Sequence, residues 1–160
     1  MIEFIKMNDN ELRELKNFAA PIWRECYDGI VAPSHIEILI AKYFDYSNIC
    51  GFLKKGMIYE YTVLKGEKIG FIAYMPCFDH VYLDKLYFLK EYRGKRLSHF
   101  VFEYLSDSFK KPLRLNVNRK NERAVRAYES NGFRIVSEEE LPQSGGFVNS
   151  DYVMERRADK

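Results

Sequence analysis

The sequence is short of the residues and spacings that mark several common protein classes. Its three cysteines, Cys26, Cys50 and Cys77, are odd in number and lack CxxC spacing, which argues against a disulfide framework and against a zinc site. The three histidines are scattered along the chain and show no metal-ligand spacing. The sequence therefore predicts no metal site.

A strong excess of charge of either sign is absent as well. The chain carries 25 Lys and Arg against 23 Asp and Glu, a net charge of +2, so any electropositive site must be local. No apolar run approaches the ~18 residues that a membrane span needs, and residues 1–12 contain no apolar signal core. We expect a protein of the reducing cytoplasm with no nucleic-acid or membrane partner.

What the sequence does contain is typical of one folded domain. Hydrophobic residues make up 47% and charged residues 30% of the 160 residues, and this length suits a single domain, residues 1–160. Aromatic content is high, with 12 Tyr, 12 Phe and one Trp. We expect most of these rings to fill the core and some to line a cavity.

Periodicity and turn signals predict a mixture of helices and strands. A helix begins at a capping residue, Asn8 or Asn10, and ends at Asp28-Gly29. Residues 68–75 are apolar on both faces, as in a central strand. The order βααβββαβαββ predicts a mixed α/β sheet rather than a doubly wound one. The other predicted strands are 2–6, 57–65, 80–88, 113–118, 133–136 and 147–154, the other helices are 33–44, 97–105 and 121–131 with a further short piece at 47–55, and a Pro142/Gly145/Gly146 loop separates the last two strands.

The segment LKEYRGKRLSHFVFEYL, residues 89–105, places a basic turn directly before an apolar-striped helix. Amide groups at a helix N-terminus lack partners within the helix and carry a partial positive charge, so anions bind there. Gly94 would let the backbone turn tightly against a ligand, and Arg93, Lys95 and Arg96 would add positive charge. The glycine spacing is not that of a P-loop or a dinucleotide fingerprint. Taken alone, the loop fits a phosphate cradle or a solvated charged turn.

The segment LNVNRKNERAVRAYESNGF, residues 115–133, favours the phosphate cradle over the solvated turn. It resembles a motif of the GNAT superfamily of acetyl-CoA-dependent N-acetyltransferases, which reads L-x-V, three residues, then N-x-x-A-x-x-x-Y-x-x-x-G-F. Small bacterial members of the polyamine-acetyltransferase type are also similar in their terminal stretches. The resemblance implies a GNAT-type, mostly antiparallel twisted sheet that is splayed between its fourth and fifth strands. The matching residues are Leu115, Val117, Asn121, Ala124, Tyr128, Gly132 and Phe133.

The basic loop matches the family's strand–loop–helix segment that ends in [Q/R]-x-x-G-x-[G/A]. Arg93 fills the first position, whereas Arg96 and Ser98 replace the usual glycine and small residue. A glycine at position 96 would permit close approach or a positive φ, but an outward-pointing arginine keeps the amides available and can pair with a phosphate. The resemblance implies acetyl-CoA as the acetyl donor, bound by Leu86, Tyr87, Phe88, Arg93, Gly94, Lys95, Arg96, Leu97, Ser98, Asn121 and Tyr128.

Acetyl transfer to an amine needs a deprotonated nucleophile and a proton for the departing thiolate. The resemblance makes Tyr128 the candidate acid, although a tyrosine on this helical face is also an ordinary core residue. Asn121 is both a helix cap and a cofactor contact in the family. Asp84 lies in an otherwise apolar strand just before the loop and is a candidate base, because partial burial would raise its pKa. A carboxylate that is merely paired or solvated is the alternative for Asp84.

The predicted activity is N-acetylation of a primary amine, with a polyamine or diamine as the first candidate acceptor. Trp23 and Tyr27 could line the acceptor site together with Asp84, although helix-to-sheet packing is the simpler role for Trp23. The other candidates are a different small amine, then a protein N-terminus or lysine. An acetyl-CoA-binding regulator without turnover remains an alternative, and a nucleic-acid-binding module that uses residues 85–96 is poorly supported. The protein is expected to be a monomer or a homodimer.

Overall fold

The structure is a computed structural model that describes residues 1–142 and 148–158. Gly145, Gly146 and Phe147, which the sequence assigned to the last loop and the start of the last strand, lie outside the described residues. No helix in the described ranges has both the length and the apolar character that crossing a membrane would require.

The elements follow each other in the order that the sequence predicts, with one more helix. The short piece predicted at 47–55 is a helix, so three helices precede the second strand instead of the two in the predicted order. The strands are β1 (Ile2–Lys6), β2 (Ile58–Leu64), β3 (Glu67–Pro76), β4 (Val81–Phe88), β5 (Leu113–Asn118), β6 (Arg134–Pro142) and β7 (Val148–Arg156), and the helices are α1 (Asp9–Cys26), α2 (Pro33–Phe44), α3 (Tyr46–Lys54), α4 (Ser98–Phe109) and α5 (Glu122–Ser130), with a 3-10 turn at Lys90–Tyr92.

The strand β6 is longer than predicted. The polar run SEEE that follows Val136 has low strand propensity, which is typical of a loop. In the structure these residues pair with β7, in a ladder that extends from Arg134↔Glu155 to Pro142↔Val148. Every residue of β6 is exposed, so backbone pairing, rather than burial of its side chains, accounts for this strand.

The helix α1 begins at Asn8, one of the two caps that the sequence allowed. The Asn8 side-chain oxygen accepts a hydrogen bond from the Glu11 amide at 2.8 Å, and the Glu11 carboxylate accepts one from the Asn8 amide at 3.0 Å. This reciprocal pair is a capping box, which satisfies two amides that the helix itself cannot.

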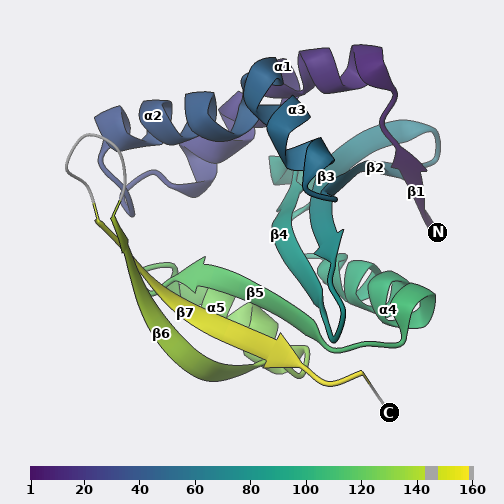
Figure 1. Cartoon of the computed structure of the whole chain (residues 1–160), viewed down its shortest axis with the longest axis vertical. Helices are drawn as coiled ribbons and strands as arrows, with labels where there is room; N and C mark the ends of the chain where they lie inside the picture. The colour runs from purple at the N-terminus through teal and green to yellow at the C-terminus, as the bar shows by residue number, and fades with distance from the viewer. Residues whose placement is uncertain (143–147, 159–160) are drawn as a thin grey trace. The chain divides into compact units, whose positions relative to one another are not determined.

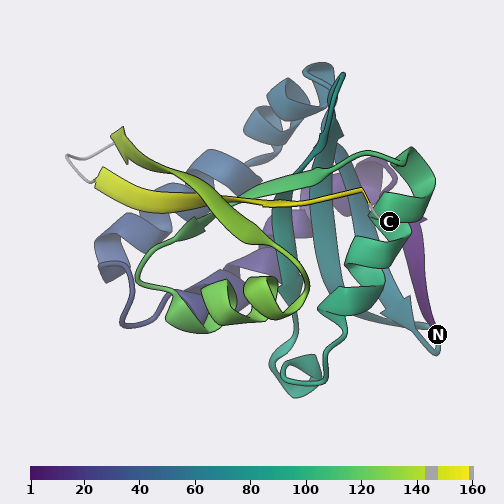
Figure 2. The same cartoon turned by 90° about the horizontal axis from the view of Figure 1, so that it is seen from below.

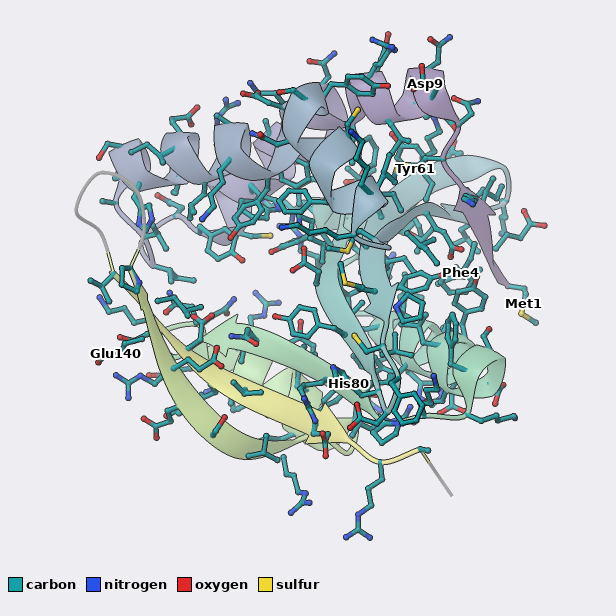
Figure 3. All side chains as sticks on the ribbon, viewed as in Figure 1. Met1, Phe4, Asp9, Tyr61, His80 and Glu140 are labelled. Carbon is teal, nitrogen blue, oxygen red and sulfur yellow. The ribbon has the colours of Figure 1, made fainter. Side chains whose placement is uncertain are left out.

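The chain divides into two compact units, of which the first comprises Met1–Tyr74 and Lys85–Lys95. In this unit β1 pairs antiparallel with β2, and β2 pairs antiparallel with β3. The helices α1, α2 and α3 lie together along one side of β2 and β3 (Figure 1). The rings of Phe18, Tyr61 and Phe71 meet between α1 and these strands, with centroid distances of 5.3 and 6.2 Å from Phe18 (Figure 3 labels Tyr61).

The second unit comprises Met75–Asp84 and Arg96–Lys160. Its strands β5, β7 and β6 form antiparallel pairs, and α5 lies across one face of β5 and β7 (Figure 2). The buried side chains of β5 alternate with Arg114, Asn116 and Asn118, which are half-buried. Consecutive residues of a strand face opposite sides, so one side of this sheet is apolar and the other carries polar groups.

The fold is a mixed α/β fold with a mostly antiparallel sheet of seven strands in the order β1-β2-β3-β4-β5-β7-β6. The exception is the parallel pair β4–β5. Within the described ranges this pair consists of Val81↔Leu113 and Tyr82↔Arg114 only, although both strands continue further. Such short pairing agrees with the predicted splay between the fourth and fifth strands.

Candidate active site

The loop before α4 has the backbone conformation that its glycine positions require. Gly94 has a φ of 75° and Arg96 has a φ of 60°, both in the left-handed region that favours glycine. Arg96 is one of three non-glycine residues with a positive φ among the described residues, and its side chain is exposed. The family pattern has a glycine at this position, and the observed φ gives the reason.

The N-terminus of α4 has no cap of its own. The N-cap residue, Leu97, offers no side-chain hydrogen bond, and the first turn contains no acidic residue. The amides of Gly94 through Ser98 have no acceptor in the part of the chain that the structure describes. Unpaired amides at the start of a 12-residue helix form a favourable place for an anion. The residues present thus fit the phosphates of a coenzyme A group.

Arg93 forms two hydrogen bonds within the first unit. Its Nε donates a hydrogen bond to the Phe88 carbonyl oxygen at 2.9 Å, and its Nη2 donates to Glu25 of α1 at 3.2 Å. These bonds tie the loop to the end of β4 and to α1, all within the first unit. The Lys95 ammonium lies 5.6 Å from the centre of the Tyr92 ring, and Lys95 itself is exposed.

The end of β4 passes very close to β3 at a glycine. A Cβ atom placed on Gly70 would lie 2.2 Å from the carbonyl oxygen of Tyr87 and 2.9 Å from Cδ1 of Phe88. Real Cβ atoms essentially never approach other atoms this closely, so only glycine fits here. Gly70 was not singled out in the sequence, and an isolated glycine inside a strand is the signal that could have found it.

The first unit brings together three of the predicted residues, Trp23, Tyr27 and Tyr87. The Trp23 ring lies 5.3 Å from Tyr27 and 5.5 Å from Tyr87, and the two tyrosine hydroxyls are 2.7 Å apart. Trp23 also packs on Phe44 of α2 at 5.0 Å and is only 5% exposed. The Trp23 ring therefore packs α1 against α2 and β4, while Tyr27 and Tyr87 carry the polar groups of this cluster.

Asn121 and Tyr128 lie at the two ends of α5. The Asn121 side chain caps the helix by accepting a hydrogen bond from the Ala124 amide at 3.3 Å. The Tyr128 ring packs against Phe133 at 5.5 Å and against Phe102 of α4 at 6.0 Å. Tyr128 is half-buried, so these contacts fix its ring without fully enclosing the side chain.

A polar network on β4, β5, β6 and β7 was missed at the level of the sequence. Asp84 is half-buried on β4, and Tyr82 on the same strand donates a hydrogen bond to Asn116 Oδ1 at 2.9 Å. Asn116 Nδ2 donates to Glu139 at 2.9 Å and to Asp151 at 3.3 Å. An asparagine in a strand is a visible signal, but a sequence cannot show which carboxylates pair with it.

Asp151 is the carboxylate of this network with a shifted acidity. Burial raises its pKa above the ordinary value, the hydrogen bond from Asn116 opposes this shift, and the negative charge of Glu139 adds to it. Within the described part of the chain, no group of His, Cys, Asp and Glu side chains is arranged to hold a metal ion.

Comparison with known proteins agrees with this geometry. The model of the acetyltransferase (GNAT) family matches residues 16–133, whereas no curated protein matches the chain. The PaiA N-acetyltransferase of Thermoplasma acidophilum, solved in complex with coenzyme A, superposes with a TM-score of 0.78 at 23% identity over 98% of this chain and 99% of that one.

Two further solved structures share the fold. The ribosomal-protein-S18-alanine N-acetyltransferase of Escherichia coli has a TM-score of 0.69 at 17% identity, covering 100% of this chain and 96% of that one. A chimera of the spermidine N-acetyltransferase SpeG of Vibrio cholerae with hSSAT has a TM-score of 0.66 at 14% identity, covering 98% and 95%. At these identities the likeness concerns the fold alone.

The chain belongs to the GNAT family of acetyltransferases, because the family model covers more than half of it, including the Asn121–Phe133 motif. It is an acyltransferase, and acetyl-CoA is the acetyl donor of its family.

Proposed function

We propose that this acetyltransferase moves the acetyl group of acetyl-CoA onto the primary amino group of a small amine, with a diamine or polyamine as the first acceptor to test. Membership of the GNAT family supports the reaction class. The observation that carries the proposal is the uncapped N-terminus of α4, preceded by Gly94 and Arg96 in the left-handed conformation. This arrangement suits a pyrophosphate.

The proposed cofactor contacts follow the order of the chain. The amides around Gly94 and Arg96 would bind the pyrophosphate, and the main chain at the end of β4 would pair with the pantetheine arm as an added strand does. Asn121 and Tyr128 would contact the arm from α5. The full proposed set is Leu86, Tyr87, Phe88, Arg93, Gly94, Lys95, Arg96, Leu97, Ser98, Asn121 and Tyr128, with Arg93 acting through its bonds to Phe88 and Glu25.

The proposed chemistry uses one phenol and one carboxylate. An alkylammonium has a pKa of about 10, so it must lose a proton before its nitrogen can attack the acetyl carbonyl. The departing thiolate needs a proton, and the Tyr128 hydroxyl would donate it. Asp84, half-buried on β4, is proposed as an acceptor-binding carboxylate and as a candidate for taking the proton from the amine.

The acceptor would be a cation that contacts aromatic rings. Tyr27 and Trp23 on α1, with Tyr87 on β4, present an aromatic cluster with two hydroxyl groups. Alkylammonium groups are attracted to the faces of such rings, which supports an amine acceptor. A protein N-terminus or lysine remains the next candidate acceptor.

We also propose that the protein is a cytoplasmic monomer or homodimer.

One observation favours a second function. Arg96 occupies a left-handed position that costs a non-glycine residue about 1–2 kcal/mol, and in the family pattern this position holds glycine. A protein that had lost turnover would tolerate such a change. The alternative is therefore a regulator that binds acetyl-CoA without acetylating an amine.

Calorimetric titration with acetyl-CoA, with ATP as the control ligand, tests the proposal on the wild type and on Arg96→Gly. Wild-type binding of acetyl-CoA but not ATP supports it, and a screen of diamines, triamines, monoamines and peptides with a free N-terminus then identifies the acceptor. Wild-type binding without acetylation of any amine in the screen favours the regulator, whereas binding gained only in Arg96→Gly would show that Arg96 blocks the site and would contradict both functions. Absence of binding in both proteins would rule out the acetyltransferase mechanism proposed above.

A further inference from the structure

The polar side of the sheet in the second unit holds two carboxylates around one amide group. Asp151 of β7 lies directly opposite Glu139 of β6 and Asn118 of β5, so these three side chains share one side of the sheet. Asn116, two residues before Asn118, faces the same side and donates to both carboxylates.

A tyrosine of β4, Tyr82, fixes the orientation of the Asn116 amide. The Tyr82 hydroxyl donates to Asn116 Oδ1 at 2.9 Å, so the amide must turn its NH₂ group toward Glu139 and Asp151. Asp151 receives this bond through Oδ2 at 3.3 Å, and its Oδ1 has no hydrogen-bond donor among the described residues. Asp151 is only 9% exposed. A buried carboxylate is thus held in one orientation with an oxygen left over.

Two neighbouring carboxylates, Glu155 and Glu138, have cationic partners, but Asp151 and Glu139 have none among the described residues. Glu155 on β7 meets Arg114 at 2.9 Å, and Glu138, whose side chain faces the other side of β6, meets Arg119 at 2.8 Å. Within residues 1–142 and 148–158, no Lys, Arg or His lies within ion-pair distance of Asp151 or Glu139. Beside Asp151 lie Glu139 from β6 and the neutral Asn116, Asn118 and Tyr82 from β5 and β4. Asp84 shares this side of β4 with Tyr82.

We propose that Asp151 is the carboxylate that takes the proton from the acceptor's ammonium group, with Asn116 as the residue that positions it. The inference rests on the proposed N-acetyltransferase function, and it assigns the base to β7 instead of to Asp84. A carboxylate that is buried beside a second negative charge binds a proton more readily than a solvated one. Such a group is better matched to proton transfer near neutral pH than an ordinary aspartate.

The proposed transfer removes two protons from the acceptor nitrogen. An N–H bond of the ammonium breaks, its electron pair stays on nitrogen as the lone pair, and the proton passes to Asp151 Oδ1. The lone pair forms the N–C bond with the acetyl carbonyl carbon, and the C–S bond breaks with its electron pair on sulfur. The second amine proton ends on the sulfur, with the Tyr128 hydroxyl as donor and recipient, and Asp151 later releases its proton to water.

The test is the pH profile of kcat/KM for wild type, Asp151→Asn, Glu139→Gln, Asp84→Asn and Glu140→Gln, with acetyl-CoA and two amines of different pKa. A limb of the pH profile that lies at the same pH for both amines reports an ionisable group of the enzyme, because a limb set by the acceptor would move with the pKa of the amine. Glu140 is exposed on β6 (Figure 3), pairs with Ser150 rather than Asp151, and is the matched control for Glu139.

We expect Asp151→Asn to lower kcat/KM by about 100-fold or more at neutral pH and to remove the enzyme's acid limb. Glu139→Gln should shift that limb to lower pH, because the negative charge beside Asp151 is gone, while Glu140→Gln should leave it in place. A purely structural role would lower activity without moving the limb. Thermal unfolding checks that each variant is folded.

An acid limb that persists in Asp151→Asn overturns the inference, as does a limb that Asp84→Asn alone removes. If Asp151→Asn does not fold, an unmoved limb in the exposed variant Glu139→Gln overturns it as well. In these cases the wild type still acetylates an amine, so the proposed function is retained. Wild type that acetylates no amine overturns both.

Discussion

The guanidinium of Arg93 is bonded to the main chain of the strand that precedes it. Its Nε donates to the carbonyl oxygen of Phe88 at 2.9 Å, and Nη2 reaches Glu25 of α1 at 3.2 Å. The position that the family pattern reserves for Gln or Arg thus joins three parts of the first unit: the end of β4, the basic loop and α1. The two acceptors need donors on separate atoms held in a fixed plane, which a guanidinium provides, whereas all three donors of an ammonium are on one nitrogen.

Arg93→Lys should therefore weaken acetyl-CoA binding although the charge is kept. Loss of a charge-assisted hydrogen bond costs roughly 1.5 kcal/mol, or about tenfold in affinity, because the β4 end and the loop are no longer held together. Calorimetric titration measures the change. Arg24→Lys is the control, because Arg24 also forms a two-point contact, with Glu37 on the exposed surface, and its replacement should leave binding unchanged. Equal affinity in Arg93→Lys and wild type would contradict this role.

Gly70→Ala should also disturb the end of β4, through the contact that β3 makes with it. The added Cβ would lie 2.2 Å from the Tyr87 carbonyl oxygen, so the backbone of β4 must move where it is proposed to pair with pantetheine. We expect destabilisation of about 1–3 kcal/mol together with weaker acetyl-CoA binding, measured by denaturant unfolding and calorimetry.

The chain offers a matched control for Gly70→Ala. Gly51 lies in α3 with no atom within 4 Å of an added Cβ, so Gly51→Ala should stabilise the protein by about 1 kcal/mol and leave binding intact. If both alanine variants bound acetyl-CoA as wild type does, the close approach at Gly70 would have no bearing on the cofactor.

Arg96→Gly should relieve backbone strain and keep acetyl-CoA binding. The left-handed φ of 60° costs an L-residue about 1–2 kcal/mol, and the greater freedom of glycine in the unfolded chain offsets about 0.5–1 kcal/mol of that gain. A net stabilisation of about 0–1.5 kcal/mol follows from these two values, measurable by denaturant unfolding. Lys110→Gly is the control, since Lys110 has a φ of 55° at the other end of α4 and should gain stability with no effect on binding.

The sequence was sufficient to predict the fold because its elements carry local signals. The Asn8 cap, the apolar stripe of α4 and the Asn121–Gly132 helix with its stop all depend on near neighbours in the chain. The extent of β6 was wrong for the opposite reason, since the SEEE run is held by pairing with β7, a contact distant in sequence. Propensity alone assigns such a run to a loop.

The sequence predicted the candidate site only where the backbone conformation of a single residue decides its role. The tight turn expected at Gly94 and the positive φ that the family's glycine at position 96 permits both agree with the structure. The tether from Arg93 to Phe88, the close approach at Gly70 and the sharing of Asn116 by two carboxylates depend on side chains that meet across strands. The roles of Tyr128 and Asp84 stay predictions.

Tyr128→Phe tests the proposed acid without changing the packing. The ring contacts with Phe102 and Phe133 remain, so stability and acetyl-CoA affinity should be close to those of wild type. Loss of the hydroxyl should lower kcat by about 100-fold, as measured with saturating amine. Tyr92→Phe removes an exposed hydroxyl that lies 3.4 Å from Glu67 and serves as the control. Wild-type kcat in Tyr128→Phe would exclude the phenol as the proton donor.

Asp151→Asn should increase stability at neutral pH even as it removes activity. Burial raises the folded-state pKa of Asp151 above the unfolded value of about 3.9, so the folded protein prefers the protonated carboxyl. The stabilisation from that preference is complete below the unfolded pKa and is lost as pH rises through the folded pKa. Wild type therefore carries the cost of a buried charge at neutral pH, which the amide does not.

The gain from Asp151→Asn should shrink as the pH is lowered toward about 4, the unfolded pKa of an aspartate, and unfolding in urea at a series of pH values measures it. Asp79→Asn provides the opposite case, because the hydrogen bond from His80 lowers the pKa of the exposed Asp79. Its contribution is present above the unfolded pKa and is lost as the pH falls, so this variant should gain nothing at neutral pH. A stability difference for Asp151→Asn that did not depend on pH would show that the carboxylate is not desolvated in the folded protein.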